Sequence, residues 1–273
     1  MHFMNKSNPI GVFDSGIGGL TVVKQLNNFL PRESIVYFGD TARVPYGTKS
    51  NSTVIEYAIQ DAHFLIKKNV KMIVVACNTV SSVALDVLRS KFDVPIVGMI
   101  EPGAKLALSE SIKKRIGVIG TEATISNAAY SKEIIKKNDS TKVFEKACPL
   151  FVPFAEEGWT EHEAAKLVAK EYLNPMREED IDTLILGCTH YPLLKNIIQD
   201  AVGKSVKLID SGSAAATVVE DYLKGRNLLN DNAEKGADFF YVTDLPNKFR
   251  YVAERFLGRK ISNINKIDLD EIR

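Results

Sequence analysis

Short apolar runs alternate along this chain with segments of helical period. Nearly continuous apolar runs such as Ile10–Phe13 are typical of strands that helices cover on both faces. Apolar residues recur every three or four positions from Ile55 to Ile66, and over a shorter stretch from Val83 to Leu88, which predicts helices with one buried face. The alternation predicts an α/β fold with mainly parallel sheets and right-handed crossovers. We expect strands at residues 10–13, 34–38, 71–76, 95–99, 115–119, 183–186 and 206–209.

The two halves of the chain resemble each other weakly. IGVFDS at 10–15 is similar to IGVIGT at 116–121, and VVACNT at 74–79 is similar to ILGCTH at 185–190. The common order predicts two pseudo-symmetric lobes. The first boundary is expected near residues 97–101, and the chain should return to the first lobe after Ser211-Gly212, because the last sixty or so residues are too few for a domain. The predicted first lobe is therefore 1–98 plus 212–273, and the second is 99–211.

Composition and charge narrow the class of protein. The chain has 273 residues, 45% of them hydrophobic and 25% charged, which excludes disordered and collagen-like chains. Its 35 basic residues almost balance 34 acidic ones, so no basic field attracts nucleic acid. The first residues lack the apolar stretch of a signal peptide, and no apolar run is long enough to span a bilayer. We expect a soluble cytoplasmic protein that acts without a membrane or nucleic acid.

The three cysteines carry the sharpest chemical signal. Their odd number and the absence of a CxxC pair argue against a disulfide framework or a structural zinc site, and favour a reducing compartment. Cys77 and Cys188 each end a predicted strand before polar residues at a predicted helix start, where a thiol pKa is lowered. The alternative for each is an inert core thiol, which is the better interpretation of Cys148.

Polar residues at other strand ends extend this pattern, because open parallel sheets bind ligands at the carboxyl ends of their strands. Asp14 and Asp40 lie at such ends, although both could instead cap helices or turns. The loop DSGIGG at 14–19 precedes a predicted helix, so its N–H groups could hold a carboxylate or phosphate. The alternative is an ordinary tight turn, and the nucleotide-binding fingerprints are absent.

Two further positions near the cysteines could take part in proton transfer. His190, two residues after Cys188, could be an acid or a proton shuttle, or a structural residue. Glu156 and Glu157 follow an apolar run, so one of them could point into a cleft; a surface pair is the alternative.

Four motifs together resemble one family. They are VFDSGIGG at 12–19, DTARVPYG at 40–47, ACNT at 76–79 and GCTHYP at 187–192. Their order and the similarity over essentially the whole chain resemble glutamate racemase, a family of cofactor-independent enzymes that supply D-glutamate for bacterial peptidoglycan. The resemblance implies two α/β lobes with the active site in the cleft between them, glutamate as the small-molecule substrate, a homodimer, and no metal or pyridoxal phosphate.

The resemblance also implies residue roles. Cys77 and Cys188 would be the acid/base pair, with Cys77 acting on D-glutamate and Cys188 on L-glutamate. Asp14 would assist Cys77, and His190 with Glu156 or Glu157, of which Glu156 is favoured, would assist Cys188. The residues expected to bind the substrate are Asp14, Ser15, Asp40, Tyr46, Gly47, Asn78, Thr79, Thr189 and His190.

Other functions remain open on the sequence. One alternative is a racemase for aspartate or another acidic amino acid, and another is a non-catalytic amino-acid-binding regulatory protein of the same fold. Binding alone needs no thiols, so the two cysteines argue against the second. A thiol hydrolase would use one cysteine with a base and an oxyanion hole, without a second opposed thiol.

Overall fold

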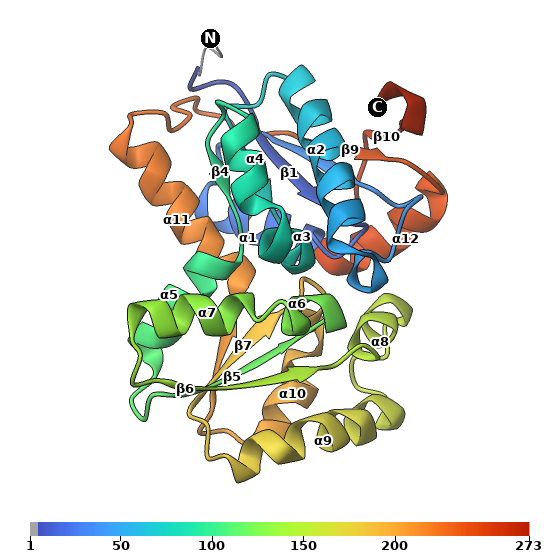
Figure 1. Ribbon diagram of the computed structural model, residues 1–273. Helices are drawn as coiled ribbons and strands as arrows, with labels where there is room; N and C mark the ends of the chain where they lie inside the picture. The colour runs from blue at the N-terminus through green and yellow to red at the C-terminus, as the bar shows by residue number, and fades with distance from the viewer. Residues whose placement is uncertain (1–4, 273) are drawn as a thin grey trace.

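The computed structural model describes residues 5–272, which form two α/β lobes stacked one on the other (Figure 1). Residues 1–4 and 273, the outer ends of the predicted first lobe, lie outside the described residues. Within the described residues, every helix is too short or too polar to cross a membrane.

The first lobe is built on a parallel sheet in the order β10-β9-β2-β1-β3-β4. Its central strands are apolar and buried along their whole length, because helices cover both faces of the sheet. The strands are β1 (Ile10–Asp14), β2 (Ile35–Gly39), β3 (Met72–Val75), β4 (Ile96–Val97), β9 (Asp238–Val242) and β10 (Ile264–Lys266).

The second lobe contains a parallel sheet in the order β6-β5-β7-β8. This order corresponds to β2-β1-β3-β4 of the first sheet, so the two sequence echoes lie on corresponding strands. Cys77 and Cys188 therefore follow corresponding strands, β3 and β7. The strands are β5 (Arg115–Gly120), β6 (Lys142–Ala147), β7 (Thr183–Gly187) and β8 (Lys207–Asp210).

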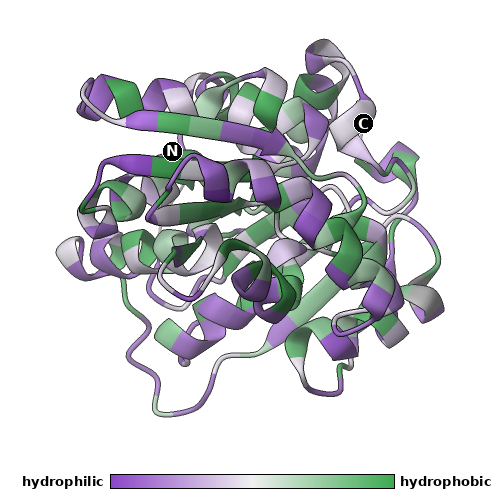
Figure 2. Ribbon diagram, turned by 90° about the horizontal axis from the view of Figure 1, so that it is seen from below, coloured by the Kyte–Doolittle hydropathy of each residue, from purple (hydrophilic) through white to green (hydrophobic). Residues whose placement is uncertain are grey.

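The helices carry apolar residues on the side that meets a sheet. Figure 2 shows this as helices with both purple and green stretches around largely green central strands. The first sheet is covered by α1 (Leu20–Phe29), α11 (Ser211–Gly225) and α12 (Pro246–Leu257) on one face, and by α2 (Asn51–Lys67), α3 (Asn78–Val83) and α4 (Leu85–Lys91) on the other. The second is covered by α5 (Ile100–Glu110) and α7 (Ala129–Lys137) on one face, and by α8 (Phe151–Glu157), α9 (Glu163–Glu178) and α10 (Lys195–Val202) on the other. The short helices are α6 (Glu122–Ser126), η1 (Tyr46–Thr48), η2 (Tyr191–Leu194) and η3 (Leu269–Glu271).

The chain passes between the sheets twice. It leaves the first sheet after β4 and enters the second through α5, and it returns to the first sheet from β8 through α11. We propose lobe boundaries at residues 98 and 212, close to the starts of these two helices.

The structure differs from the predicted elements at three strands and one helix. The predictions missed β6, which is half-buried and carries lysines and a glutamate, and the mixed strands β9 and β10. A strand at or near a sheet edge needs no continuous apolar run, so this signal was absent. The predicted helical stretch Val83–Leu88 is divided between α3 and α4, which meet at Ala84.

Candidate active site

A cavity of about 280 Å³ lies between the lobes, where the carboxyl ends of β1, β3, β5 and β7 meet. The loop between β2 and α2 and one face of α8 complete its wall. The predicted site residues that line it are Ser15, Tyr46, Gly47, Cys77, Asn78, Thr79, Glu156, Cys188, Thr189 and His190. Asp14 and Asp40 are buried but do not line the cavity.

Cys77 is the N-cap residue of α3, and its Sγ lies 3.6 Å from Ser15 Oγ. Burial, and next the carboxylate of Asp14, raise the pKa of this thiol to about 12, although hydrogen bonds from the Val80 N–H and from Ser15 act in the opposite direction. The predicted lowering of the Cys77 pKa at a helix start is therefore wrong. The helix has only six residues, and its N-terminal field is outweighed by burial beside an acid.

Cys188 follows β7 and lies beside His190, with 3.8 Å between Sγ and Nδ1. The other ring nitrogen of His190, Nε2, is 3.0 Å from Glu156 Oε1. Burial lowers the pKa of His190, but hydrogen bonds to Cys188 and Glu156 outweigh it and raise this pKa to about 10. His190 is therefore an imidazolium at neutral pH. The predicted helix start directly after Cys188 is wrong, because η2 begins only at Tyr191 and α10 at Lys195.

The Glu156 carboxylate reaches His190 from α8 in the second lobe, close to the helix C-terminus. The backbone carbonyl of Glu156 accepts a hydrogen bond from Arg255 on α12 in the first lobe. Phe256, the next residue on α12, sets its ring edge-on to His190, with 5.6 Å between the ring centroids. Helix α12 thus supports both partners of this ion pair from the opposite lobe.

Asp14 lies behind the cavity wall and accepts a hydrogen bond of 3.0 Å from the Gly16 N–H. Burial raises the pKa of Asp14, and the positive charge of His190 opposes this rise. The loop after Asp14 packs directly on the second lobe, since a Cβ at Gly18 would lie 2.2 Å from Thr189 Oγ1 and 2.5 Å from the His190 ring. Only glycine permits this approach between the loops after β1 and β7.

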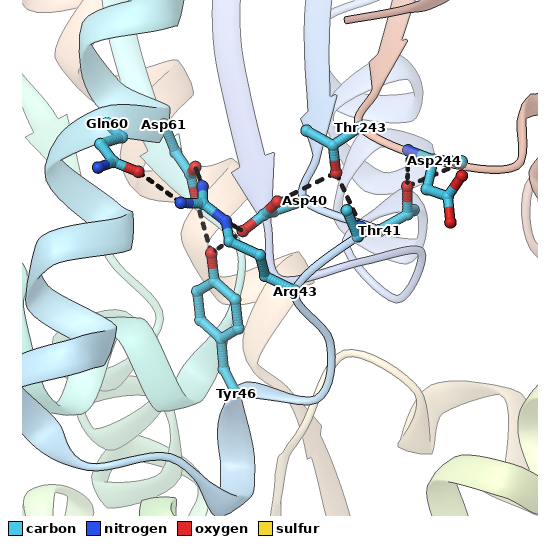
Figure 3. Close-up of polar contacts among 9 residues, drawn as sticks. Asp40, Thr41, Arg43, Tyr46, Gln60, Asp61, Thr243 and Asp244 are labelled. Atoms are coloured by element: carbon cyan, nitrogen blue, oxygen red, sulfur yellow. Dashed lines mark hydrogen bonds and ion pairs between the residues drawn. The ribbon is translucent and has the colours of Figure 1, made fainter. Parts of the chain in front are cut away.

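Asp40 is hydrogen-bonded to two side chains of the loop that forms part of the cavity wall, Arg43 and Tyr46 (Figure 3). The Asp40 carboxylate accepts hydrogen bonds from the Arg43 guanidinium and from the hydroxyls of Tyr46 and Thr243. The expected direct contact of Asp40 with the substrate is therefore not available in this arrangement. Its carboxylate oxygens are engaged within the protein, and the cavity is lined by the neighbouring residues of the loop.

Polar residues after β3 connect the lobes across the cavity. The hydroxyl of Tyr130 donates to Asn78 Oδ1 over 2.7 Å, and the hydroxyls of Thr79 and Thr121 are 2.9 Å apart. Thr121 lines the cavity with Glu122 but was not among the predicted site residues. The signal for Thr121 was present, because it ends the echo IGVIGT at the position where Ser15 ends IGVFDS. Pro149, Val152 and Pro153, which form another part of the wall, follow the edge strand β6 that carried no such signal.

Among the described residues that line the cavity there is no lysine or arginine; the ionisable side chains there are Tyr46, Cys77, Cys188, His190, Glu122 and Glu156. Within residues 5–272 no group of three or more histidine, cysteine and acidic side chains is placed to hold a metal ion. The groups that can donate to an anion are hydroxyls, amides and backbone N–H groups at the strand ends, together with the imidazolium.

Two α/β lobes of matching topology each place a thiol at one shared cavity. The chain belongs to the Asp/Glu/Hydantoin racemase family, whose model matches residues 10–219. It is 50% identical over 261 residues to the glutamate racemase of Geobacter metallireducens, covering 96% of this chain and 97% of that protein. It is 46% identical to the enzyme of the same name from Neisseria meningitidis, covering 98% of this chain and 100% of that one.

Solved structures agree with this assignment. A glutamate racemase isoform from Bacillus anthracis superposes with a TM-score of 0.94 at 38% identity, over 97% of this chain and 99% of that one. The glutamate racemase of Francisella tularensis, solved in complex with D-glutamate, has a TM-score of 0.91 at 44% identity, with the same coverage. An aspartate racemase homologue from Pyrococcus horikoshii, at 17% identity and a TM-score of 0.58, shares the fold.

Proposed function

We propose that this protein interconverts L- and D-glutamate with two cysteines as its acid and base. The observation that carries the proposal is that Cys77 and Cys188 line one cavity from corresponding strand ends of the two lobes. Racemisation removes the α-proton from one face of the carbon and returns a proton to the other face. Two bases on opposite sides of a bound substrate can do this, whereas one base does not readily reach both faces.

The electrostatics of the site favour one direction. Cys77, with a pKa of about 12, carries its proton at neutral pH, so it is prepared to act as the acid. The imidazolium of His190 stabilises negative charge on the neighbouring Cys188 sulfur, which makes Cys188 the base. The site is then prepared for L-glutamate, the direction that produces the D-enantiomer.

The reaction balances within the protein. The Cys188 thiolate takes the α-proton of L-glutamate, and the electron pair left on the carbon takes the proton of the Cys77 thiol from the opposite face. D-glutamate leaves a Cys188 thiol and a Cys77 thiolate, and the reverse reaction restores the starting state. In the reverse direction, where Cys77 must lose its proton to act as the base on D-glutamate, Asp14 assists it, because burial raises the pKa of the Asp14 carboxyl and makes it a better acceptor for that proton.

Neutral donors hold the substrate in this proposal. Ser15, Asn78, Thr79 and Thr189 line the cavity beside the two thiols and bind the carboxylates and the ammonium group together with backbone N–H groups. The same fixed dipoles stabilise the charge that develops on the α-carbon. The mechanism uses side chains of this chain alone and requires no metal or pyridoxal phosphate.

Aspartate is the competing substrate, since it lacks one methylene of glutamate. One methylene in a pocket discriminates between substrates by roughly 10- to 200-fold. Glutamate is favoured because relatives of this chain at 44–50% identity carry the name glutamate racemase, whereas the aspartate racemase homologue matches at 17%.

Incubation of the purified protein with L-glutamate in D₂O tests the proposal. We expect the circular dichroism signal of the amino acid to vanish while one deuterium enters the α-position, and L-aspartate to react at least about tenfold more slowly. Protein dialysed against a chelator should keep its activity. If L-glutamate kept both its optical activity and its α-proton, racemisation would be refuted. Activity restored only by a metal or pyridoxal phosphate would refute the two-thiol mechanism.

Single substitutions test the roles of the thiols. Cys77→Ser and Cys188→Ser should each lower kcat/KM by at least about 10³-fold, because a hydroxyl is a much poorer base than a thiolate. Cys148→Ser is the matched control, since this buried thiol does not line the cavity. A Cys148→Ser variant as inactive as the other two would overturn the assignment.

We further propose that the product serves peptidoglycan precursor synthesis in the cytoplasm and that the enzyme is a homodimer. Cells depleted of the protein should then require external D-glutamate for growth. Sedimentation of the purified protein should give twice the mass of the 30.2 kDa chain.

A further inference from the structure

A buried polar cluster outside the cavity joins α2 to the loop that forms the cavity wall (Figure 3). Asp61 on α2 and Asp40 at the end of β2 have fully buried side chains and face the same guanidinium. Arg43 Nε donates to Asp40 Oδ2 over 2.6 Å, and Arg43 Nη2 donates to Asp61 Oδ1 over 3.2 Å. The hydroxyl of Tyr46 hydrogen-bonds to Asp40 and lies 3.3 Å from Asp61 Oδ2.

The hydrogen-bond donors of this cluster are too few to satisfy both Asp40 and Asp61 as ionised carboxylates. The Tyr46 hydroxyl has a single hydrogen, which Asp40 takes, so Asp61 Oδ2 is satisfied when it carries a proton and donates to the Tyr46 oxygen. A neutral Asp61 also leaves one negative and one positive charge in the buried cluster, which avoids an uncompensated buried charge. Burial, and next the charge of Asp40, raise the pKa of Asp61 well above its ordinary value.

The cluster fixes the part of the loop that faces the substrate. Arg43 and Tyr46 flank Val44 and Pro45, and residues 44–48 line the cavity. Val44 is 47% exposed, so packing of its own side chain contributes little to the position of the loop. The loop is held through Arg43 and Tyr46, which are both hydrogen-bonded to Asp61 on α2 as well as to Asp40, while Arg43 also donates to Gln60 on α2.

We propose that Asp61 is a positioning residue that ties Arg43 and Tyr46 to α2 and so fixes the cavity wall at residues 44–48. It acts through these two side chains and does not itself line the cavity. Its kinetic consequence rests on the proposed racemisation of glutamate. Its structural consequence, the order of the loop, is independent of that proposal.

Two substitutions at Asp61 and one matched control test this role. Asp61→Ala removes both contacts, whereas Asp61→Asn keeps the shape and the neutral charge, since an amide can accept from Arg43 and donate to Tyr46. The control is Glu33→Gln, which removes the negative charge of another buried ion pair, to Lys71 at 2.5 Å, at the amino ends of β2 and β3 in the same sheet. Three quantities are measured for each variant: the midpoint of thermal unfolding, hydrogen–deuterium exchange of residues 41–48, and kcat and KM for both glutamate enantiomers.

We expect Asp61→Ala to accelerate exchange in residues 41–48 and to raise KM about tenfold with a smaller change in kcat, because the wall contributes to binding. Asp61→Asn should keep KM within about twofold of the unmodified protein. Glu33→Gln should lower the unfolding midpoint without changing KM or the exchange of the loop. Unchanged exchange in a folded Asp61→Ala variant would overturn the positioning role, even if the protein did not racemise glutamate. An Asp61→Asn variant as impaired as Asp61→Ala would overturn the neutral state of Asp61.

Discussion

The ion pair between His190 and Glu156 provides a quantitative test of the site. Glu156→Gln removes the carboxylate charge that faces His190 Nε2 at 3.0 Å and leaves a side chain of the same shape. We expect the pKa of His190 to fall from about 10. The adjacent Glu157→Gln is a matched control, because Glu156 is the acid hydrogen-bonded to His190.

The size of this shift follows from the geometry. A hydrogen bond to a charged group contributes about 1.5–3 kcal/mol, and one pKa unit corresponds to about 1.36 kcal/mol, so the full effect is roughly one to two units. The Glu156 side chain is 43% exposed, and solvent screening therefore reduces the expected shift to about one unit. Near pH 9 the protonated fraction of His190 should then fall from roughly nine tenths to about one half.

Nuclear magnetic resonance of histidine-labelled protein measures this pKa directly. The chain has four histidines, so the signal of His190 is assigned by its loss in His190→Asn. The titration should run from about pH 6 to about pH 11 to cover both the ordinary and the raised pKa values. A pKa of His190 that is unchanged in Glu156→Gln, or lowered equally in Glu157→Gln, would refute the assignment of Glu156 as the partner.

Three further predictions concern the same site. Gly18→Ala should lower kcat/KM by about 10²-fold, because its Cβ would lie 2.2 Å from Thr189 Oγ1; Gly225→Ala, with nothing within 4 Å, should leave the kinetics unchanged. Alkylation of Cys77 by iodoacetamide, followed by peptide mass spectrometry, should accelerate about tenfold per pH unit, and a plateau below about pH 10 would contradict the raised pKa of this thiol. The proton of His190 is bound more tightly in the folded chain than in the unfolded one, so its contribution to stability is present below about pH 6.5 and is lost as the pH rises through about 10. Urea unfolding should therefore show a larger decrease in stability over this range for the unmodified protein than for His190→Asn.

The sequence alone determined the class of fold, because burial of a parallel sheet on both faces demands continuous apolar strands. The apolar runs at β1, β3, β5 and β7 predicted these strands in both lobes, and the sequence similarity between the two halves predicted their matching topology. The edge strand β6 and the strands β9 and β10 escaped prediction, since their mixed polarity leaves no continuous apolar run. The rule that ligands bind at the carboxyl ends of parallel strands also pointed to both cavity cysteines from the sequence.

Tertiary structure decided the electrostatics of the site. A helix start after Cys77 is visible in the sequence, but its effect on the thiol is reversed by burial and by Asp14, which comes from a different strand. Likewise, the choice between Glu156 and Glu157 depends on the rotation of α8 against His190, more than thirty residues away along the chain. Charges and low-dielectric surroundings act through space, so a pKa depends on neighbours that local sequence does not identify.

The role of Asp40 shows the same division between sequence and structure. A carboxylate at a strand end was recognisable from the sequence, but whether it meets the substrate or the protein depends on which donors surround it. Those donors, Arg43, Tyr46 and Thr243, come from the loop beside Asp40 and from a residue about two hundred positions later. The strand pattern therefore fixes where a polar residue leaves the sheet. The packing of distant segments decides whether that residue binds a ligand or the protein itself. The physical reason is that a buried carboxylate must be satisfied by whichever hydrogen-bond donors the fold brings to it.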